Sequence, residues 1–300
     1  MARPSRFEVI YKKILIITDY LKKQPKILFS SSDLRKIFSK KRKEWGIPKK
    51  TTFYEFLESL ILKNIIISVN IPMHNQIKYA LFSSSEYKIA LEIKKDAYFC
   101  HRTAMYIHNL IPNEPEPINI YINSEQRKKP NNKDTLLIQE NINKAFSQHM
   151  RETKQIVKVK NSNIYVLSGK KLNRLGVEIA NFKSEKVPVT GLERTLIDIT
   201  VRPNYAGGVN EILKAYLMAK DKIDVPKLVS MLNKMKYIYP YHQAIGFYME
   251  NAGYKDCDLN LLREINIIYD FYLTYAMTEK SYSKKWKIFY PKDFCSLEAE

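Results

Sequence analysis

Residues 49–82, KKTTFYEFLESLILKNIIISVNIPMHNQIKYALF, decide the fold that we expect for the first part of the chain. After two lysines, apolar residues recur at intervals of three and four, which is typical of a helix that begins near Thr51. The period then shortens, because 65–69 (IIISV) and 77–82 (IKYALF) are short, rich in β-branched or aromatic residues, and joined by the polar loop PMHNQ. The stretch therefore predicts a helix followed by a β-hairpin.

Two more helices are expected upstream of this stretch. Apolar residues at helical spacing between residues 7 and 17 predict a first helix, which Pro25 ends. The cluster SSSD at 30–33 suits the N-cap of a short second helix, and Gly46 with Pro48 makes a turn before the third helix. Three helices followed by a hairpin is the order of a winged helix-turn-helix, in which the hairpin is the wing.

The rest of the chain mixes the two periods, so we expect an α+β fold. The N-terminal winged helix-turn-helix DNA-binding domain takes residues 1–83, and a mixed α/β C-terminal domain takes residues 84–300. Ser83 with Glu86, and Thr190 with Glu193, have the spacing of capping boxes. Expected helices are 86–95, 99–110, 136–151, 209–220, 225–236, 241–252 and a short one within 258–266; expected strands are 118–122, 156–159, 164–167, 177–180 and 286–290.

The basic charge of the chain is uneven. Lys and Arg number 50 against 31 Asp and Glu, which gives a net charge of +19. Residues 1–82 hold 17 basic and 6 acidic side chains, a net of +11, and the remaining 218 residues supply only +8. This concentration favours a polyanionic partner for the N-terminal domain.

The expected DNA contacts follow from the winged-helix order, in which the third helix enters the major groove. Lys49 and Lys50 suit phosphates at the start of that helix, and Thr51, Thr52 and Tyr54 suit base edges or the sugar-phosphate backbone. A solvated basic bundle without a ligand is the alternative. The expected DNA-binding residues are Arg35, Lys36, Lys40, Lys41, Arg42, Lys43, Lys49, Lys50, Thr51, Thr52, Tyr54, Asn75, Gln76 and Lys78.

A second group of basic residues lies in the C-terminal part. The sequence leaves open whether this group extends a DNA contact, touches another partner or has neither role. Its members are Lys158, Lys160, Lys170, Lys171 and Arg174.

Signs of catalysis and of metal binding are weak. The three cysteines, at 100, 257 and 295, are widely spaced, which fits a reducing cytosol, and no metal-ligand spacing occurs among the histidines. We expect no metal, no cofactor and no enzyme activity. Glu92-Ile93-Lys94 matches the tail of a nuclease motif, so a nuclease-like enzyme targeted by the winged helix stays open as an alternative. No apolar run reaches the ~18 residues that span a bilayer, so we expect a cytoplasmic protein without a membrane partner.

Several blocks beyond residue 98 carry a resemblance to a known family. They are FCHRTAMYIHNL at 99–110; VTGLERTLID at 189–198 with Arg202-Pro203 and GGV at 207–209; and YPYHQAIGFY at 239–248 with AGY at 252–254. Together with the N-terminal domain they resemble the AbiEi antitoxins of the bacterial abortive-infection AbiE toxin–antitoxin systems, which act in phage defence. Cys100 departs from the small Ser-like residue expected there.

The resemblance implies a two-domain antitoxin that is also a transcriptional repressor. Its winged helix binds inverted repeats in double-stranded DNA and represses its own operon. Its C-terminal domain neutralises a cognate nucleotidyltransferase-like toxin without a stable complex. A plain transcription factor without a toxin is the alternative. The motif residues of the antitoxin domain are Glu193, Arg194, Thr195, Asp198, Arg202, Gly207, Gly208, Tyr241 and His242.

Some of these motif residues also have a structural explanation from the sequence alone. Arg194 and Asp198 are four apart, so they lie on one face of a helix and can pair. Gly207-Gly208 allows a turn with positive φ before the next helix. Tyr241 and His242 suit core positions with polar tips.

Overall fold

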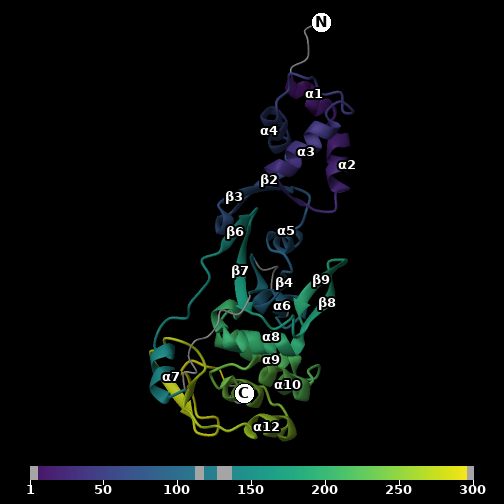
Figure 1. Cartoon of the computed structure of the whole chain (residues 1–300). Helices are drawn as coiled ribbons and strands as arrows, with labels where there is room; N and C mark the ends of the chain where they lie inside the picture. The colour runs from purple at the N-terminus through teal and green to yellow at the C-terminus, as the bar shows by residue number, and fades with distance from the viewer. Residues whose placement is uncertain (1–5, 112–117, 127–136, 296–300) are drawn as a thin grey trace. The chain divides into compact units, whose positions relative to one another are not determined.

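The computed structural model describes residues 6–111, 118–126 and 137–295. The chain divides into two compact units, Met1–Ala97 with Gln155–Val166, and Tyr98–Lys154 with Leu167–Glu300. Each unit combines helices with β-strands, so the fold is α+β (Figure 1). The division groups 84–97 and 155–166 with the N-terminal part, whereas the sequence analysis assigned both segments to the C-terminal domain.

The helices of the first unit run from purple to blue in Figure 1. They are α1 (Arg6–Lys12), α2 (Ile14–Lys22), α3 (Ser31–Lys41), α4 (Phe53–Leu62) and α5 (Glu86–Ile93). The single helix expected before Pro25 is wrong, because the backbone leaves the helical conformation at Lys13 (φ −103°, ψ 3°).

Capping boxes fix the start of α3 and α4. The Ser30 hydroxyl accepts a hydrogen bond from the Asp33 amide, and the Asp33 carboxylate accepts one from the Ser30 amide. Thr52 and Glu55 make the same reciprocal pair at the start of α4. Each box satisfies backbone amides that a helix start leaves without a partner.

A three-stranded antiparallel sheet completes the first unit, with strand order β1-β3-β2. β2 (Ile66–Ile71) and β3 (Gln76–Leu81) form the expected hairpin, and Asn75 turns the chain between them with φ 46°. β1 (Leu28–Ser30) pairs with β3 from Leu28 opposite Ala80 to Ser30 opposite Lys78. β1 was not predicted from the sequence, because three residues are too few to show a hydrophobic period.

Two contacts explain why the first unit includes later segments of the chain. The Glu92 carboxylate of α5 accepts hydrogen bonds from the amides of Ile27, at 3.0 Å, and Leu28, at 2.9 Å. Lys160, in the turn between β6 (Ile156–Val159) and β7 (Ser162–Lys170), donates to the Ser84 carbonyl oxygen at 2.8 Å. Both contacts join residues more than 60 positions apart, so no local pattern could reveal them.

The second unit has a mixed sheet in which β5, β4, β9 and β8 are neighbours in that order. β4 pairs with β9 in parallel and with β5 in antiparallel orientation. A smaller sheet has the order β10-β12-β11. The strands are β4 (Tyr98–Phe99), β5 (Asn119–Gln126), β8 (Val177–Phe182), β9 (Glu185–Thr190), β10 (Phe271–Tyr272), β11 (Lys280–Ser283) and β12 (Ile288–Pro291).

Four helices of the second unit, α6, α9, α10 and α11, pack against α8. In α11 the side chains from Tyr241 to Met249 are all buried, and Gly246 lies so close to Trp286 that an added Cβ would overlap the indole ring. The helices are α6 (His101–Ile107), α7 (Gln139–Phe146), α8 (Leu192–Val201), α9 (Val209–Ala219), α10 (Val225–Met235), α11 (Tyr241–Asn251) and α12 (Asp256–Arg263).

Several expectations for the second unit are confirmed and others are wrong. The helices expected at 209–220, 225–236 and 241–252 are α9, α10 and α11, each one residue shorter. The helices expected at 99–110 and 136–151 are much shorter, because the first begins after strand β4 and the second is only α7.

Both capping boxes expected after residue 82 are wrong. Thr190 is the last residue of β9, and Gly191 stands at the N-cap of α8 without a side-chain bond. Ser85, and not Ser83, caps α5 by accepting from the Lys88 amide at 3.3 Å. Among the residues that the structure describes, no helix is long and apolar enough to cross a membrane.

Candidate nucleic-acid interface

A compact turn joins α3 to α4 in the first unit. The Gly46 amide donates to the Lys43 carbonyl oxygen at 3.0 Å, and the Ile47 amide donates to the Arg42 carbonyl oxygen at 3.0 Å. Trp45 is buried in this turn and stacks on Phe56 of α4, with ring centroids 6.0 Å apart. The turn therefore fixes the direction in which α4 starts.

The first residues of α4 carry exposed side chains of the kind that bind nucleic acid. Lys49 and Lys50 are exposed immediately before the helix, and Tyr54 is 71% exposed on its first turn. Thr52 is exposed, although its hydroxyl is engaged in the capping box. Thr51 is only 2% exposed, so the expectation that its side chain reaches a base is not met in this structure.

Arg35 of α3 extends over the start of α4. Its guanidinium carbon lies 4.5 Å from the ring centroid of Phe53 and 5.8 Å from that of Tyr54. Such cation–π contacts hold the charge beside the helix start and leave the guanidinium edges free for acceptors.

The basic run at the end of α3, Lys40 to Lys43, divides into engaged and available side chains. Lys41 pairs with Glu44 at 2.7 Å, and this hydrogen bond raises the pKa of Lys41. Arg42 lies over the Phe38 ring, 5.7 Å from its centroid. Lys40 and Lys43 are exposed, and no described carboxylate lies within ion-pair distance of either. Two of the four charges in this run, those of Lys40 and Lys43, are therefore available to a ligand.

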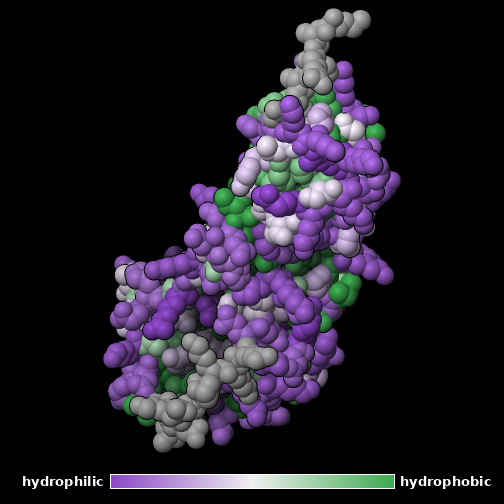
Figure 2. Space-filling model, turned by 45° about the horizontal axis from the view of Figure 1, so that its top comes forward, coloured by the Kyte–Doolittle hydropathy of each residue, from purple (hydrophilic) through white to green (hydrophobic). Residues whose placement is uncertain are grey.

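The β2–β3 hairpin presents a polar tip. Asn75 and Gln76 are exposed there, and Lys78 is half-buried on β3 between Val69 of β2 and Ser30 of β1. Figure 2 shows hydrophilic residues over most of the visible face of this unit, with hydrophobic residues in separate patches. In the described part of the chain, these side chains have no carboxylate partner: Arg35, Lys36, Lys40, Lys43, Lys49, Lys50 and Lys78.

The motif residues of the second unit are mostly buried around α8. Arg194 Nε donates to Asp198 Oδ1 at 2.9 Å, and Arg194 Nη1 donates to the Leu175 carbonyl oxygen at 2.6 Å. Burial raises the pKa of the Asp198 carboxyl, and Arg194 beside it opposes that rise. The expected i,i+4 pair is thus present as a buried ion pair.

Glu193 and Thr195 connect α8 to its neighbours. Glu193 Oε2 pairs with Lys227 of α10 at 2.8 Å, and its Oε1 accepts from the Asp224 amide at 3.3 Å. The Thr195 hydroxyl donates to the Thr190 carbonyl oxygen at 2.9 Å. These bonds explain why Glu193 does not close a capping box with Thr190.

The remaining motif residues shape the turn after α8 and the start of α11. Gly207 and Gly208 have φ of 98° and 99°, which favours glycine. His242 is 8% exposed, and burial lowers its pKa to about 4. Tyr241 is also buried, so both residues occupy the core positions expected for them.

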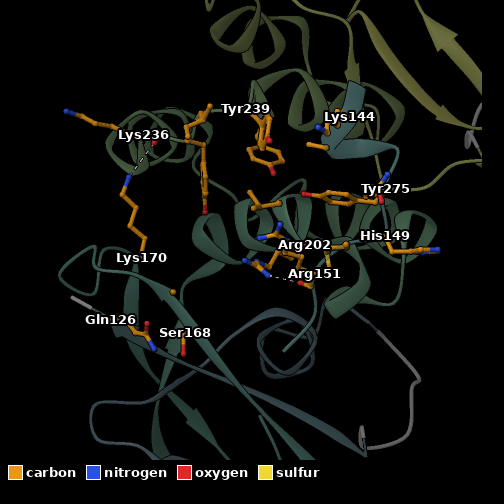
Figure 3. A pocket seen from close by; sticks show the side chains of 18 of the residues that line it. Gln126, Lys144, His149, Arg151, Ser168, Lys170, Arg202, Lys236, Tyr239 and Tyr275 are labelled. Carbon is orange, nitrogen blue, oxygen red and sulfur yellow. Dashed lines mark hydrogen bonds between the residues drawn. The ribbon is translucent and has the colours of Figure 1, made fainter. Parts of the chain in front are cut away.

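Two motif residues, Arg202 and Tyr241, line a pocket of about 1190 Å³ within the second unit (Figure 3). Lys170 and Lys171 of the C-terminal basic group line it too, whereas Lys160 and Arg174 do not. The pocket was not expected from the sequence, because its described walls come from six separate stretches of chain; the adjacent lysines 170 and 171 were the one signal of it.

The nuclease-like alternative rests on Glu92, whose side chain has other contacts. Glu92 accepts hydrogen bonds from two backbone amides, as described above. Cys257 and Cys295 are exposed, and Cys100 is buried. Among the described residues, no group of three or more His, Cys, Asp or Glu side chains is placed to hold a metal ion.

No model of a protein family and no curated protein matches the chain. The crystal structure of the RV2827C protein from Mycobacterium tuberculosis is similar in fold, with a TM-score of 0.60 over 93% of this chain and 91% of that chain. The sequence identity is 12%, so this likeness concerns the fold alone.

Proposed function

We propose that the first unit is a winged helix-turn-helix that binds double-stranded DNA, and that the chain is an antitoxin that represses its own operon. In this proposal α3 and α4 are the helix-turn-helix, α4 enters the major groove, and the β2–β3 hairpin is the wing. The observation that carries the proposal is the start of α4, where Lys49, Lys50 and Tyr54 are exposed beside Arg35.

The charges at this start suit phosphates, and the shape suits a groove. A helix N-terminus adds the attraction of free amides for an anion, and lysines without carboxylate partners lose no ion pair when they bind a phosphate. The polar wing tip at Asn75 and Gln76 supplies donors for an adjacent minor groove or backbone. An inverted-repeat operator then requires two protomers per site.

The antitoxin half of the proposal is supported by the sequence resemblance. The motif residues of the second unit hold α8, α10 and the turn at Gly207 together, which is what a stable neutralising domain needs. The proposed partner is a nucleotidyltransferase-like toxin that is neutralised in the cytoplasm without a stable complex. The proposal includes no catalysis and no cofactor.

Salt-dependent binding tests the DNA half. The full chain is titrated against labelled duplex DNA from upstream of its own gene, at several salt concentrations. Lys49→Ala with Lys50→Ala should lower the slope of log K against log salt by about 2, because each phosphate contact contributes about 0.9. Lys222→Ala with Lys255→Ala removes the same charge from the second unit and should leave the slope unchanged. An unchanged slope in the first variant would place those lysines away from phosphates.

Co-expression tests the antitoxin half and the alternatives. The chain should restore growth to cells that express a nucleotidyltransferase-like toxin encoded beside it, and a plain transcription factor would not. A nuclease-like enzyme would instead cleave labelled DNA in the presence of magnesium, with the cleavage lost in Glu92→Gln, which keeps an acceptor for the amides of β1.

A further inference from the structure

The pocket of the second unit gathers positive charge from several separate stretches of the chain. Its cationic side chains come from α7, the 148–151 segment, the end of β7, the end of α8 and the end of α10. Among the described residues that line it, none is Asp or Glu. The Lys and Arg side chains are Lys144, Arg151, Lys170, Lys171, Arg202 and Lys236.

Backbone carbonyl oxygens fix the position of two of these cationic groups, Lys170 and Arg202. Lys170 Nζ donates to the Lys236 carbonyl oxygen at 3.4 Å, and Arg202 Nη1 donates to the Arg151 carbonyl oxygen at 3.3 Å. Among the described residues, no carboxylate lies within ion-pair distance of these four side chains. Like charges in a concave site create a positive potential that favours a ligand with several negative charges.

The buried carboxylate of Asp198, four residues before Arg202, does not cancel this charge. Arg202 contributes to the electrostatic environment of Asp198, but Asp198 is paired with Arg194 at 2.9 Å. The pair is neutral as a whole, so Arg202 keeps its charge available to the pocket.

Tyrosine rings supply the second chemical feature. Figure 3 shows Tyr239 and Tyr275 extending toward Arg202 and Arg151, and Lys170 and Lys236 lie at another side of the pocket. Phe146 fixes both rings from behind, stacked on Tyr275 with centroids 4.4 Å apart and edge-on to Tyr239 at 5.3 Å. The rings are half-buried, so each keeps a surface in the pocket.

We infer that this pocket binds a segment of single-stranded nucleic acid, with its phosphates at the Lys and Arg side chains and its bases against the tyrosines. Positive charge combined with fixed aromatic rings is the chemistry of single-strand binding. The bases of a duplex are paired and stacked on each other, so they cannot reach rings inside a pocket. The volume of about 1190 Å³ exceeds the roughly 300–1,000 Å³ of small-molecule sites, which leaves room for more than one nucleotide.

Binding of labelled ten-nucleotide oligomers to the full chain tests this inference. The probes are oligo(U), oligo(dT) and a duplex of equal length, with ATP as a competitor. Lys144→Ala, Lys171→Ala and Lys236→Ala together should lower the salt slope for single strands by about 2, since each phosphate contact contributes about 0.7. Extrapolated from 1 M to 0.1 M salt, that slope corresponds to about 100-fold weaker binding.

Matched variants separate the pocket from general charge and from the first unit. Lys222→Ala, Lys255→Ala and Lys284→Ala remove three exposed charges elsewhere on the second unit and should leave single-strand binding unchanged. Lys49→Ala with Lys50→Ala should weaken binding of the duplex and leave binding of the single strands unchanged. Failure of the operator proposal is therefore distinguishable from failure of this one.

Substitution of Tyr239 tests the role of the rings. Tyr239→Leu should weaken single-strand binding about tenfold, and Tyr239→Phe should retain it, because stacking needs the ring and not the hydroxyl. Circular dichroism checks that both variants fold. Equal binding by the pocket variant and its lysine control would overturn the inference, and so would binding of ATP without binding of either oligomer.

Discussion

The buried Arg194–Asp198 pair makes the stability of the second unit depend on pH in a way that one substitution reveals. Arg194 is 3% exposed and Asp198 is 5% exposed. Replacing Arg194 with Met keeps a side chain of similar length and removes the charge paired with Asp198. A buried carboxyl without its counter-charge takes up a proton, because burial disfavours the charged form.

The free energy of that protonation sets the expected loss of stability. A carboxyl with an unfolded pKa of about 3.9 costs about 4 kcal/mol to protonate at pH 7 and about 1.5 kcal/mol at pH 5. The pKa of Asp198 in the folded variant lies above its unfolded value, so stability is greatest below pH ~3.9 and falls as the pH rises. Arg202 stays in place and stabilises the carboxylate in part, so these values are upper bounds.

Tryptophan fluorescence measures the loss. The chain has two tryptophans, Trp45 in the first unit and Trp286 in the second, so urea unfolding in a Trp45→Phe background follows the second unit alone. Arg194→Met should be destabilised more at pH 7 than at pH 5, by up to about 2.5 kcal/mol. Arg194→Lys keeps a charge and should show much less pH dependence. The same loss at both pH values would refute the reasoning from burial.

Two further predictions concern the core contacts of each unit. Burial holds the pKa of His242 at about 4, below its ordinary ~6.5. Its stabilising contribution is therefore complete above pH 6.5 and falls by about 3 kcal/mol as the pH drops to 4. In unfolding followed by Trp286 fluorescence, His242→Gln should flatten this loss of stability, and an unchanged loss contradicts the prediction. Glu92→Ala should destabilise the first unit by about 1–3 kcal/mol, because the amides of Ile27 and Leu28 lose their acceptor, whereas Glu92→Gln should lose less; equal Trp45 unfolding curves would contradict this.

Patterns within about ten residues predicted local structure well. The Ser30 cap, the hairpin and the helices α9 to α11 follow from caps and from hydrophobic period, both of which are properties of neighbouring residues. The same kind of signal failed at Thr190, because a capping-box spacing also occurs where a strand ends. The Thr190 hydroxyl there bonds Thr195, and Glu193 pairs with Lys227 instead.

Contacts between distant parts of the chain could not be predicted from the sequence. Nothing near Glu92 indicates that its carboxylate caps the amides of β1, and nothing near Lys160 indicates that it bonds Ser84. The tripeptide at Glu92 therefore looked like a fragment of catalytic motif. A short motif acquires a role only through the residues that the fold brings to it.

The charge count shows the same limit for function. Outside residues 1–82 the chain has a net charge of only +8, which as an average over 218 residues suggests no particular partner. In the part of the chain that the structure describes, six Lys and Arg side chains lie around one pocket, and Asp and Glu are absent from its lining. The potential that a ligand meets depends on this local arrangement and not on the average. A modest charge excess is therefore compatible with a strongly basic site, and the motif residue Arg202 lies in it.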